Sequence, residues 1–489
     1  MQRPNIILFF TDQQRADTIA ASGNPVIQTP AMDKLVREGV SFDRAFSPSP
    51  VCVPARCSMF YGLYPHHTDC YDNNNPMPDG CPSVASALQD AGYRTHGIGK
   101  MHFTPDLLAL RGFETRERQE EIFGAPQTDY TKYLSDNGIN HVFDYHGQRS
   151  EMYYVPQLAQ TSAEHHPTNW IGSRSCEFIE NHDFNRPLFL MSSFIHPHPP
   201  FAVPTPWNKL YRSAETPPPH VPENSESLTT WFNRHQNNFK YKDAGVDGNL
   251  TRTTKAFYYA CISFIDYQIS RVLDALERRG QLDNSMIVLT SDHGELMGDY
   301  NCFGKRSMLD PSARIPLIVR YPEKKYAGAR VDDAASLVDL MPTFLTAAGA
   351  EHSNIELDGA DLERAARGEL KREYVFSQIK SGNGALYMVA SRDKKYIYSA
   401  ADQKEFFLDR TLDPLETVNF AAGGRTHPDM AAMKKLLIET VAIEGDNTEG
   451  GDWKPYPPLA FAPRPGYQDN ASVRDAESVL PPGYRVNLK

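Results

Sequence analysis

The sequence contains no cysteine pair spaced as C-x-x-C, and its seven cysteines are an odd number scattered along 489 residues. This absence argues against a zinc knuckle and a disulfide framework, and it is typical of thiols that stay reduced. An excess of basic residues is also missing, because the formal net charge is −11. A nucleic-acid or anionic-membrane surface needs a basic face, so we expect neither partner.

A signal-like apolar run at the N-terminus is missing as well. The first apolar run, NIILFF at 5–10, is too short for a secretory signal, and it ends in the polar stretch TDQQRAD without a small-residue cleavage site. We therefore expect a cytoplasmic protein. Hydrophobic residues make up 40% and charged residues 23% of the chain, as in ordinary folded proteins.

Apolar runs of strand length alternate with helix-like stretches over most of the chain. Strands are predicted at 5–10, 39–46, 93–99, 187–196, 286–291 and 316–322. Helices are predicted at 31–39, 83–92, from about 251 to 280, and at 336–349. Runs that are apolar on successive residues suit strands buried on both faces, as in parallel sheets covered by helices. The pattern predicts an α/β fold.

The pattern changes near residue 373. Four short alternating strands are predicted beyond it, followed by a helix at 428–443. Because single cores stop growing at roughly 250 to 300 residues, we expect two domains. These are a catalytic α/β domain at 1–372 and a smaller antiparallel sheet and helix domain at 373–489.

Three stretches lack regular periodicity. Residues 104–170 and 199–249 are rich in proline, asparagine, histidine and aromatic residues, as expected of long insertions that cover a site and shape substrate choice. The Gly- and Pro-rich tail from Glu444 is predicted to wrap over a surface or a neighbouring subunit. This tail is the one feature of the sequence that indicates a homo-oligomer.

Side chains with ligand or acid–base chemistry follow the predicted strands or precede a helix. They are Asp12, Gln13, Cys52, Lys100, His102, Asp292 and His293. Ligands bind at the carboxyl ends of strands in open α/β sheets, so we expect these residues to meet in one crevice. Oxygen donors with one imidazole suit calcium, or manganese, better than zinc. Taken singly, an aspartate after a strand is more often a turn residue.

The stretch Cys52-Val-Pro-Ala-Arg56 resembles the sulfatase signature C-x-P-x-R, in which a dedicated enzyme oxidises the cysteine to formylglycine. Further similar motifs lie before and after this signature, in this order along the chain: TDQ at 11–13, GKMH at 99–102, HPHPPF at 196–201, SDHGE at 291–295, FGKRSMLDPSARIPLIV at 303–319 and DRTLDPLETVN at 409–419. The chain resembles the type I, formylglycine-dependent sulfatases of the alkaline phosphatase-like superfamily. The TDQ and DHGE motifs, which contain Gln13 and His293, resemble those of the bacterial branch near choline sulfatases and phosphonate monoester hydrolases.

This resemblance implies a large, mostly parallel sheet between helices and a smaller C-terminal antiparallel sheet. It implies a sulfuric ester hydrolase in which a hydrated aldehyde at position 52, bound to a divalent cation, attacks sulfur and then expels sulfate. Calcium is the expected cation, with manganese or magnesium as alternatives. The implied partners are a small-molecule or saccharide sulfate ester and the formylglycine-generating enzyme.

The resemblance also implies the site residues. The metal ligands are Asp12, Gln13, Cys52, Asp292 and His293. The catalytic residues are Cys52, Arg56, Lys100, His102, His198 and Lys305. Arg56 is expected to hold the nucleophile and the negative charge of the site, His102 to act as base, and His198 with Lys305 to protonate or stabilise the leaving group. Substrate contacts are expected from Asn73, Lys100, His198 and Lys305.

Purely structural roles remain alternatives for single residues, and two other functions remain alternatives for the protein. A lysine such as Lys100 is usually a solvated surface residue, and an asparagine such as Asn73 in an Asn-rich turn is usually a turn former. A phosphonate monoester or phosphodiester hydrolase would use the same aldehyde and metal. A binding protein for sulfated ligands would result if Cys52 stayed unmodified. Choline, aryl and saccharide esters all remain open as substrates.

Overall fold

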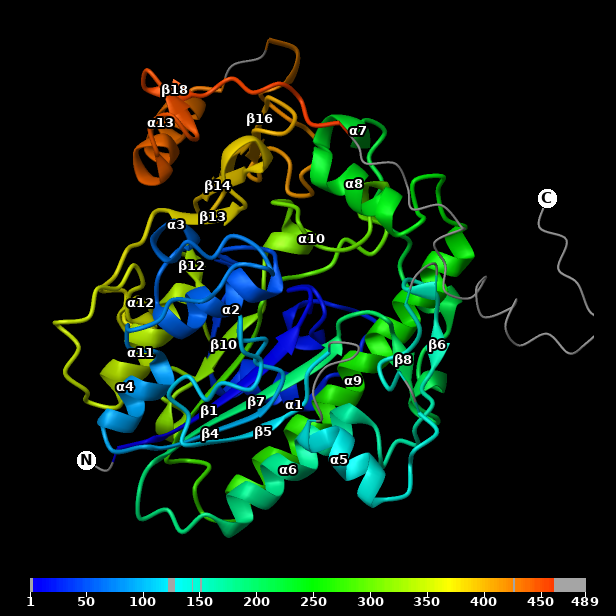
Figure 1. Cartoon of the computed structure of the whole chain (residues 1–489), viewed down its shortest axis with the longest axis vertical. Helices are drawn as coiled ribbons and strands as arrows, with labels where there is room; N and C mark the ends of the chain where they lie inside the picture. Colours follow the sequence, from blue (N-terminus) through cyan, green and yellow to red (C-terminus); the bar gives the residue numbers. More distant parts are fainter. Residues whose placement is uncertain (1–2, 122–127, 143, 150–151, 425–426, 461–489) are drawn as a thin grey trace, which may run out of the picture.

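The computed structural model describes residues 3–121, 128–142, 144–149, 152–424 and 427–460. An eight-stranded sheet forms the centre of the larger part (Figure 1). Its strands are β1 (Asn5–Asp12), β2 (Val40–Phe42), β4 (Arg94–Gly99), β5 (Thr115–Arg118), β7 (Leu188–Pro197), β9 (Ser285–Ser291), β10 (Leu317–Arg320) and β11 (Ala329–Val331). Their order is β11-β2-β10-β9-β1-β7-β4-β5, and β10 alone among these eight runs antiparallel to its neighbours. The mostly parallel α/β sheet is thus confirmed.

Helices cover both faces of this sheet because its central strands are apolar on both sides. Ile6 and Leu8 of β1 enter one hydrophobic cluster, and Ile7 and Phe9 enter another on the opposite face. The first cluster contains residues of α2 (Cys52–Tyr61), α4 (Val84–Asp90) and α11 (Leu340–Ala347). The second contains residues of α1 (Pro30–Glu38), α6 (Pro167–Asn181) and α9 (Gly248–Arg278).

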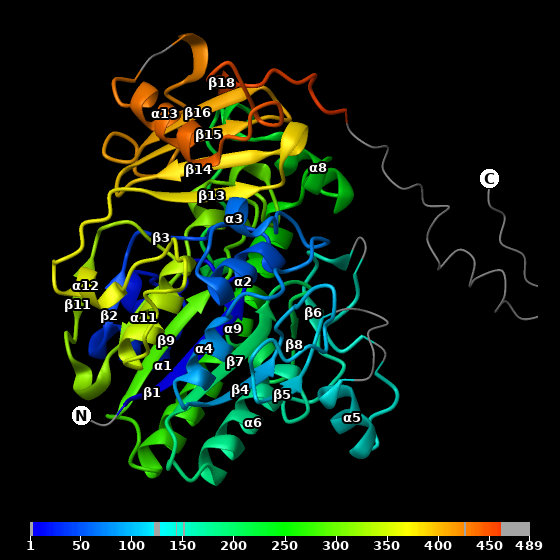
Figure 2. The ribbon, with the colours of Figure 1, turned by 60° about the vertical axis from the view of Figure 1, so that its left-hand side comes forward.

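A second, antiparallel sheet follows in the chain, as predicted, with one helix on it (Figure 2). It consists of β13 (Val375–Ile379), β14 (Leu386–Ala390), β15 (Lys394–Ser399), β16 (Lys404–Asp409) and helix α13 (Met430–Val441). One face of this sheet packs on α13, and the other shares a hydrophobic cluster with Phe46, Leu296 and Met308 of the larger part. The domain boundary at residue 373 stays a prediction.

The segment 39–46 differs from the single strand that we predicted. It forms β2, which pairs with β10 and β11, and then β3 (Ala45–Phe46), which pairs with β12 (Ala335–Ser336) in a separate two-stranded sheet. The polar Asp43 and Arg44 lie between the two strands. The prediction was wrong here because strand partners come from distant parts of the chain, which a local apolar pattern does not encode.

Helices that the sequence pattern did not predict begin within the two insertions. Helix α6 starts with Pro167 in its first turn, and His166 Nδ1 accepts a hydrogen bond from the Thr168 N–H at 3.2 Å. Helix α8 (Trp231–Phe239) lies in the second insertion. None of the helices in the described ranges combines the length and apolarity that a bilayer span requires. Of the predicted tail, the part from residue 461 lies outside the described residues.

Candidate active site

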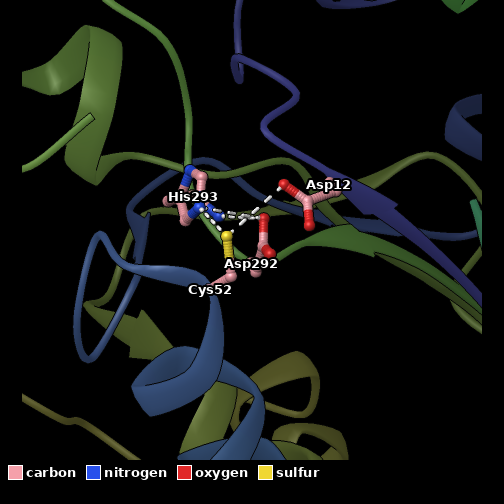
Figure 3. A group of neighbouring side chains, drawn as sticks. All are labelled: Asp12, Cys52, Asp292 and His293. Carbon is pink, nitrogen blue, oxygen red and sulfur yellow. Dashed lines mark hydrogen bonds and ion pairs between the residues drawn. The ribbon is translucent and has the colours of Figure 1, made fainter. Parts of the chain in front are cut away.

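Three segments that are far apart in the sequence bring four ligand-type side chains to one point (Figure 3). Asp12 ends β1, Cys52 begins α2, and Asp292 and His293 directly follow β9. Because β1 and β9 are parallel neighbours, their carboxyl ends lie side by side. One ligand atom from each of the four buried side chains lies within 4.8 Å of the others.

Gln13 offers a further oxygen to this cluster. Its amide nitrogen donates a hydrogen bond to the carboxylate of buried Glu295, which fixes the orientation of the amide. Its amide oxygen is buried without a hydrogen-bond partner in the described part of the chain, and Gln13 lines the same cavity as Cys52. A buried oxygen without a partner is unfavourable unless a ligand satisfies it. With two carboxylates and an imidazole, this oxygen completes a donor set that fits a hard divalent cation.

Arg56 lies one turn along α2 and is fully buried. Its guanidinium is 3.2 Å from Asp12 Oδ2 and 3.3 Å from Asp292 Oδ2, and it donates to the Lys100 carbonyl at 2.7 Å. From the sequence, Arg56 was expected to hold the nucleophile as well as the negative charge of the site. Its side chain donates to the two carboxylates, to the Lys100 carbonyl and to the Ser193 hydroxyl, so it compensates charge and fixes both carboxylates. Contact with the nucleophile stays a prediction.

Two lysines place positive charge beside Cys52. Lys305 Nζ lies 2.6 Å from Cys52 Sγ, while Lys100 Nζ lies 2.6 Å from Asp12 Oδ2 and also pairs with Glu121. Burial and the charge of Asp12 work to raise the pKa of the Cys52 thiol, but Lys305 and Lys100 outweigh them and hold it well below its ordinary value. The site therefore stabilises negative charge at the position of Sγ.

The two carboxylates have opposite pKa shifts. Burial works to raise the pKa of Asp12, but the positive charges around it, Lys100 foremost, hold that pKa well below its ordinary value. Burial and the charge of Asp12 raise the pKa of Asp292 to about 6. Two ionised carboxylates this close repel each other, and a dication held between them would favour the ionised form of both.

Two histidines flank Cys52. His198 Nδ1 is 2.6 Å from the Pro199 carbonyl, which can only accept, so Nδ1 carries a hydrogen and Nε2 is the atom that exchanges a proton. Nε2 lies 3.4 Å from the Tyr153 hydroxyl, and burial lowers the pKa of this histidine. His102 has a left-handed backbone with φ 55°, lines the same cavity as Cys52, and contributes to lowering the pKa of the Cys52 thiol.

Asn73 caps the helix that carries Cys52. Its Oδ1 accepts a hydrogen bond from the Val53 N–H at 3.1 Å, and the N-cap residue Val51 has no side chain able to do so. Asn73 also lines the cavity above Cys52. One of its two polar groups is thus committed to the helix, which leaves the amide nitrogen for a ligand.

The site opens into a cavity of about 560 Å³ whose walls include residues that no sequence motif indicated. Glu121 binds Lys100 and Arg149, and lies 3.4 Å from His198 Nδ1. Tyr153 and Lys240 lie on the wall as well. Glu121, Arg149, Tyr153 and Lys240 come from the two aperiodic insertions. The richness of these insertions in charged and aromatic residues was the one sequence feature that could have indicated them.

Family profiles and related sequences match most of the chain. The family profile described as Sulfatase matches residues 4–350, and one described as N-sulphoglucosamine sulphohydrolase, C-terminal, matches residues 298–442. An arylsulfatase of Clostridium perfringens is 28% identical over 468 residues, which cover 89% of this chain and 94% of the relative. A choline-sulfatase of Rhizobium meliloti is 28% identical over 455 residues, which cover 88% and 85%.

Solved structures share the fold over nearly the whole chain. The crystal structure of a phosphonate monoester hydrolase of Agrobacterium radiobacter aligns with a TM-score of 0.75 at 25% identity, covering 90% of this chain and 95% of that one. This similarity confirms the predicted fold, in which a large, mostly parallel sheet is followed by a smaller antiparallel sheet. Since the sulfatase profile matches well over half of the residues, the chain belongs to the sulfatase family.

Proposed function

We propose that the protein hydrolyses sulfate monoesters, releasing inorganic sulfate and an alcohol, with a nucleophile made from Cys52 by oxidation to formylglycine. The observation that carries the proposal is the position of Cys52 at the start of α2, among Asp12, Asp292 and His293 and 2.6 Å from Lys305 Nζ. The aldehyde would supply an oxygen nucleophile and a second hydroxyl through which sulfate can leave.

Asp12, Gln13, Asp292 and His293, with the group at position 52, would hold the divalent cation. Calcium is our first choice and manganese or magnesium the alternatives, and the cation would polarise the sulfate and acidify the nucleophile. Membership of the family and the donor set support a divalent cation. Its identity as calcium is the proposal.

The remaining residues stabilise negative charge on the sulfate or transfer protons. Lys100 and Lys305 stabilise the sulfate oxygens, because their ammonium groups already favour negative charge at position 52. His102, which lines the same cavity as Cys52, serves as the base that assists sulfate release. His198 presents Nε2 as the proton donor to the departing alkoxide. Asn73 caps the N-terminus of α2 and offers its amide nitrogen to substrate.

A phosphonate monoester or phosphodiester is the second candidate substrate, because a phosphonate monoester hydrolase shares the fold at 25% identity. We expect 4-nitrophenyl sulfate to be hydrolysed with a higher kcat/KM than 4-nitrophenyl phenylphosphonate under the same metal and pH conditions. The shared leaving group makes the ratio a comparison of the transferred groups alone. A ratio that favours the phosphonate by tenfold or more would reverse the assignment.

The proton-donor role of His198 predicts a dependence on the leaving group. His198→Ala should lower kcat/KM little for a 4-nitrophenyl ester and by about 10²-fold or more for an alkyl or unactivated phenyl ester, because poor leaving groups need the proton. A plot of log kcat/KM against leaving-group pKa measures this as a steeper slope. His67→Ala, which alters a half-exposed histidine bound to Asp358, is the control. Equal losses across the series would exclude the role.

A further inference from the structure

The outer wall of the active-site cavity carries an excess of positive charge, although the whole chain has a net charge of −11. Five cationic side chains line the cavity: Arg149, Lys240, Lys305, Arg306 and Lys380. Two carboxylates, those of Asp72 and Glu121, line the same cavity. Local charge of this sign in an acidic protein marks a surface that attracts anions.

Three of these cations form no ion pair with a carboxylate among the described residues, and we call Lys240, Arg306 and Lys380 the outer cations. The Lys240 ammonium lies over the Tyr153 ring, 3.5 Å from its centroid. The Arg306 guanidinium is 3.3 Å from the neutral amide oxygen of Gln236. Lys380 is exposed at the rim. Arg149 and Lys305 differ, since they contact Glu121 and Cys52.

The repulsion among these groups acts on the pKa of Lys240. Burial, and then the charges of Arg149, Lys305 and Arg306, lower the pKa of Lys240 to about 7, against a smaller opposing effect of Glu121. Crowded cations of this kind are unfavourable without an anion. A negative group on the ligand would remove that penalty.

The sulfate group that reacts does not account for the outer cations. Lys100 and Lys305 already surround position 52 at the base of the cavity. On the basis of the proposed function, we propose that the alcohol part of the substrate carries a second anionic group, a carboxylate or another sulfate, which Lys240, Arg306 and Lys380 bind. The same charges repel a quaternary ammonium, which disfavours choline sulfate as the substrate.

Matched aryl sulfates test this inference. The substrates are the sulfate esters of 4-hydroxyphenylacetate, of its neutral amide, and of 4-hydroxybenzyltrimethylammonium. In each of them a methylene group insulates the phenol from the charge, so that the leaving groups have similar pKa values. At low ionic strength we expect kcat/KM for the phenylacetate to exceed that for the amide by tenfold or more, and that for the ammonium ester to be lowest. Salt should reduce these differences.

Variants identify the groups responsible. Replacing Lys240, Arg306 and Lys380 together by methionine, which keeps chain length similar, should bring the phenylacetate-to-amide ratio close to one. Each single variant should lower it in part. Lys435→Met, on the exposed face of α13, removes one charge elsewhere and should leave the ratio unchanged. A fourth ester, 4-(sulfomethyl)phenyl sulfate, carries a sulfonate that is not hydrolysed, and it distinguishes a preference for a sulfur oxyanion from one for a carboxylate.

The outcomes separate this inference from the proposed function. Turnover of the neutral amide with no preference for either anionic ester would overturn the inference and leave the sulfatase assignment standing. A preference that survives in the triple variant would also overturn it. If that variant does not fold, a wild-type ratio that stays constant as salt is added would overturn it instead. Absence of turnover on every ester, in protein that carries the aldehyde at position 52 and bound metal, would refute the proposed function.

Discussion

Replacing Cys52 by serine is expected to leave a folded protein whose turnover of sulfate esters is lower by several orders of magnitude. Serine has one hydroxyl, so a sulfate group transferred to it could leave only by attack of an outside water on a crowded, negatively charged centre. The side chain is nearly the same size, and Lys305 Nζ can donate to it, so the loss of stability should be small. Steady-state rates and the thermal midpoint measure the two effects.

The control for this variant makes the same chemical change at another buried cysteine. Cys261 lies in α9 and belongs to the hydrophobic cluster on the other face of the sheet. Cys261→Ser should keep the aldehyde at position 52 and most of the activity. Wild-type rates in Cys52→Ser would refute the proposed nucleophile, as would an intact thiol at Cys52, measured by mass spectrometry, in fully active protein.

Removing the Asp292 carboxylate should abolish retention of the metal. In Asp292→Ala the cluster loses one of its two carboxylates, and Arg56 keeps only one carboxylate partner, Asp12, so positive charge is no longer balanced at the site. Changes to residues that merely support a metal ligand typically cost 10- to 100-fold in affinity, and loss of a ligand should cost at least as much. Elemental analysis after dialysis gives the metal content per chain.

Asp283→Asn provides the comparison, because Asp283 is mostly exposed and pairs with Arg320 far from the cluster. It should retain the full complement of metal. Treatment of the wild type with a chelator should abolish turnover, and calcium should restore it more completely than manganese or magnesium. Full metal content in Asp292→Ala would exclude the proposed ligand set, whereas recovery with manganese alone would change only the identity of the ion.

The parallel sheet and its ligand-bearing ends could be predicted because the signals are local. Asp12 follows an unbroken apolar run, and Cys52 stands in a short motif that precedes a helix. The contacts of Arg56 with two carboxylates could not be foreseen, since they depend on how β1 and β9 pair. Local sequence does not determine which strands pair.

The walls of the cavity were harder to predict for a different reason. Glu121 and Lys240 belong to insertions without periodicity, and a charged residue there is expected to be solvated until the chain is seen to fold back over the site. The capping role of Asn73 was equally hidden, because its partner Val53 lies 20 residues away. Sequence motifs thus indicated the candidate site residues, while the groups that line the cavity walls required the structure.

Cys52 is 1% exposed, at the floor of a site closed in by α2 and the chain around β9. No second protein could bring its own catalytic groups to that sulfur once the chain has folded. Under the proposed function, we therefore expect oxidation by a separate enzyme to come before closure, during synthesis or shortly after it. The competent fraction of a preparation would then be set in the producing cell, and molecules that fold with a thiol would stay inactive.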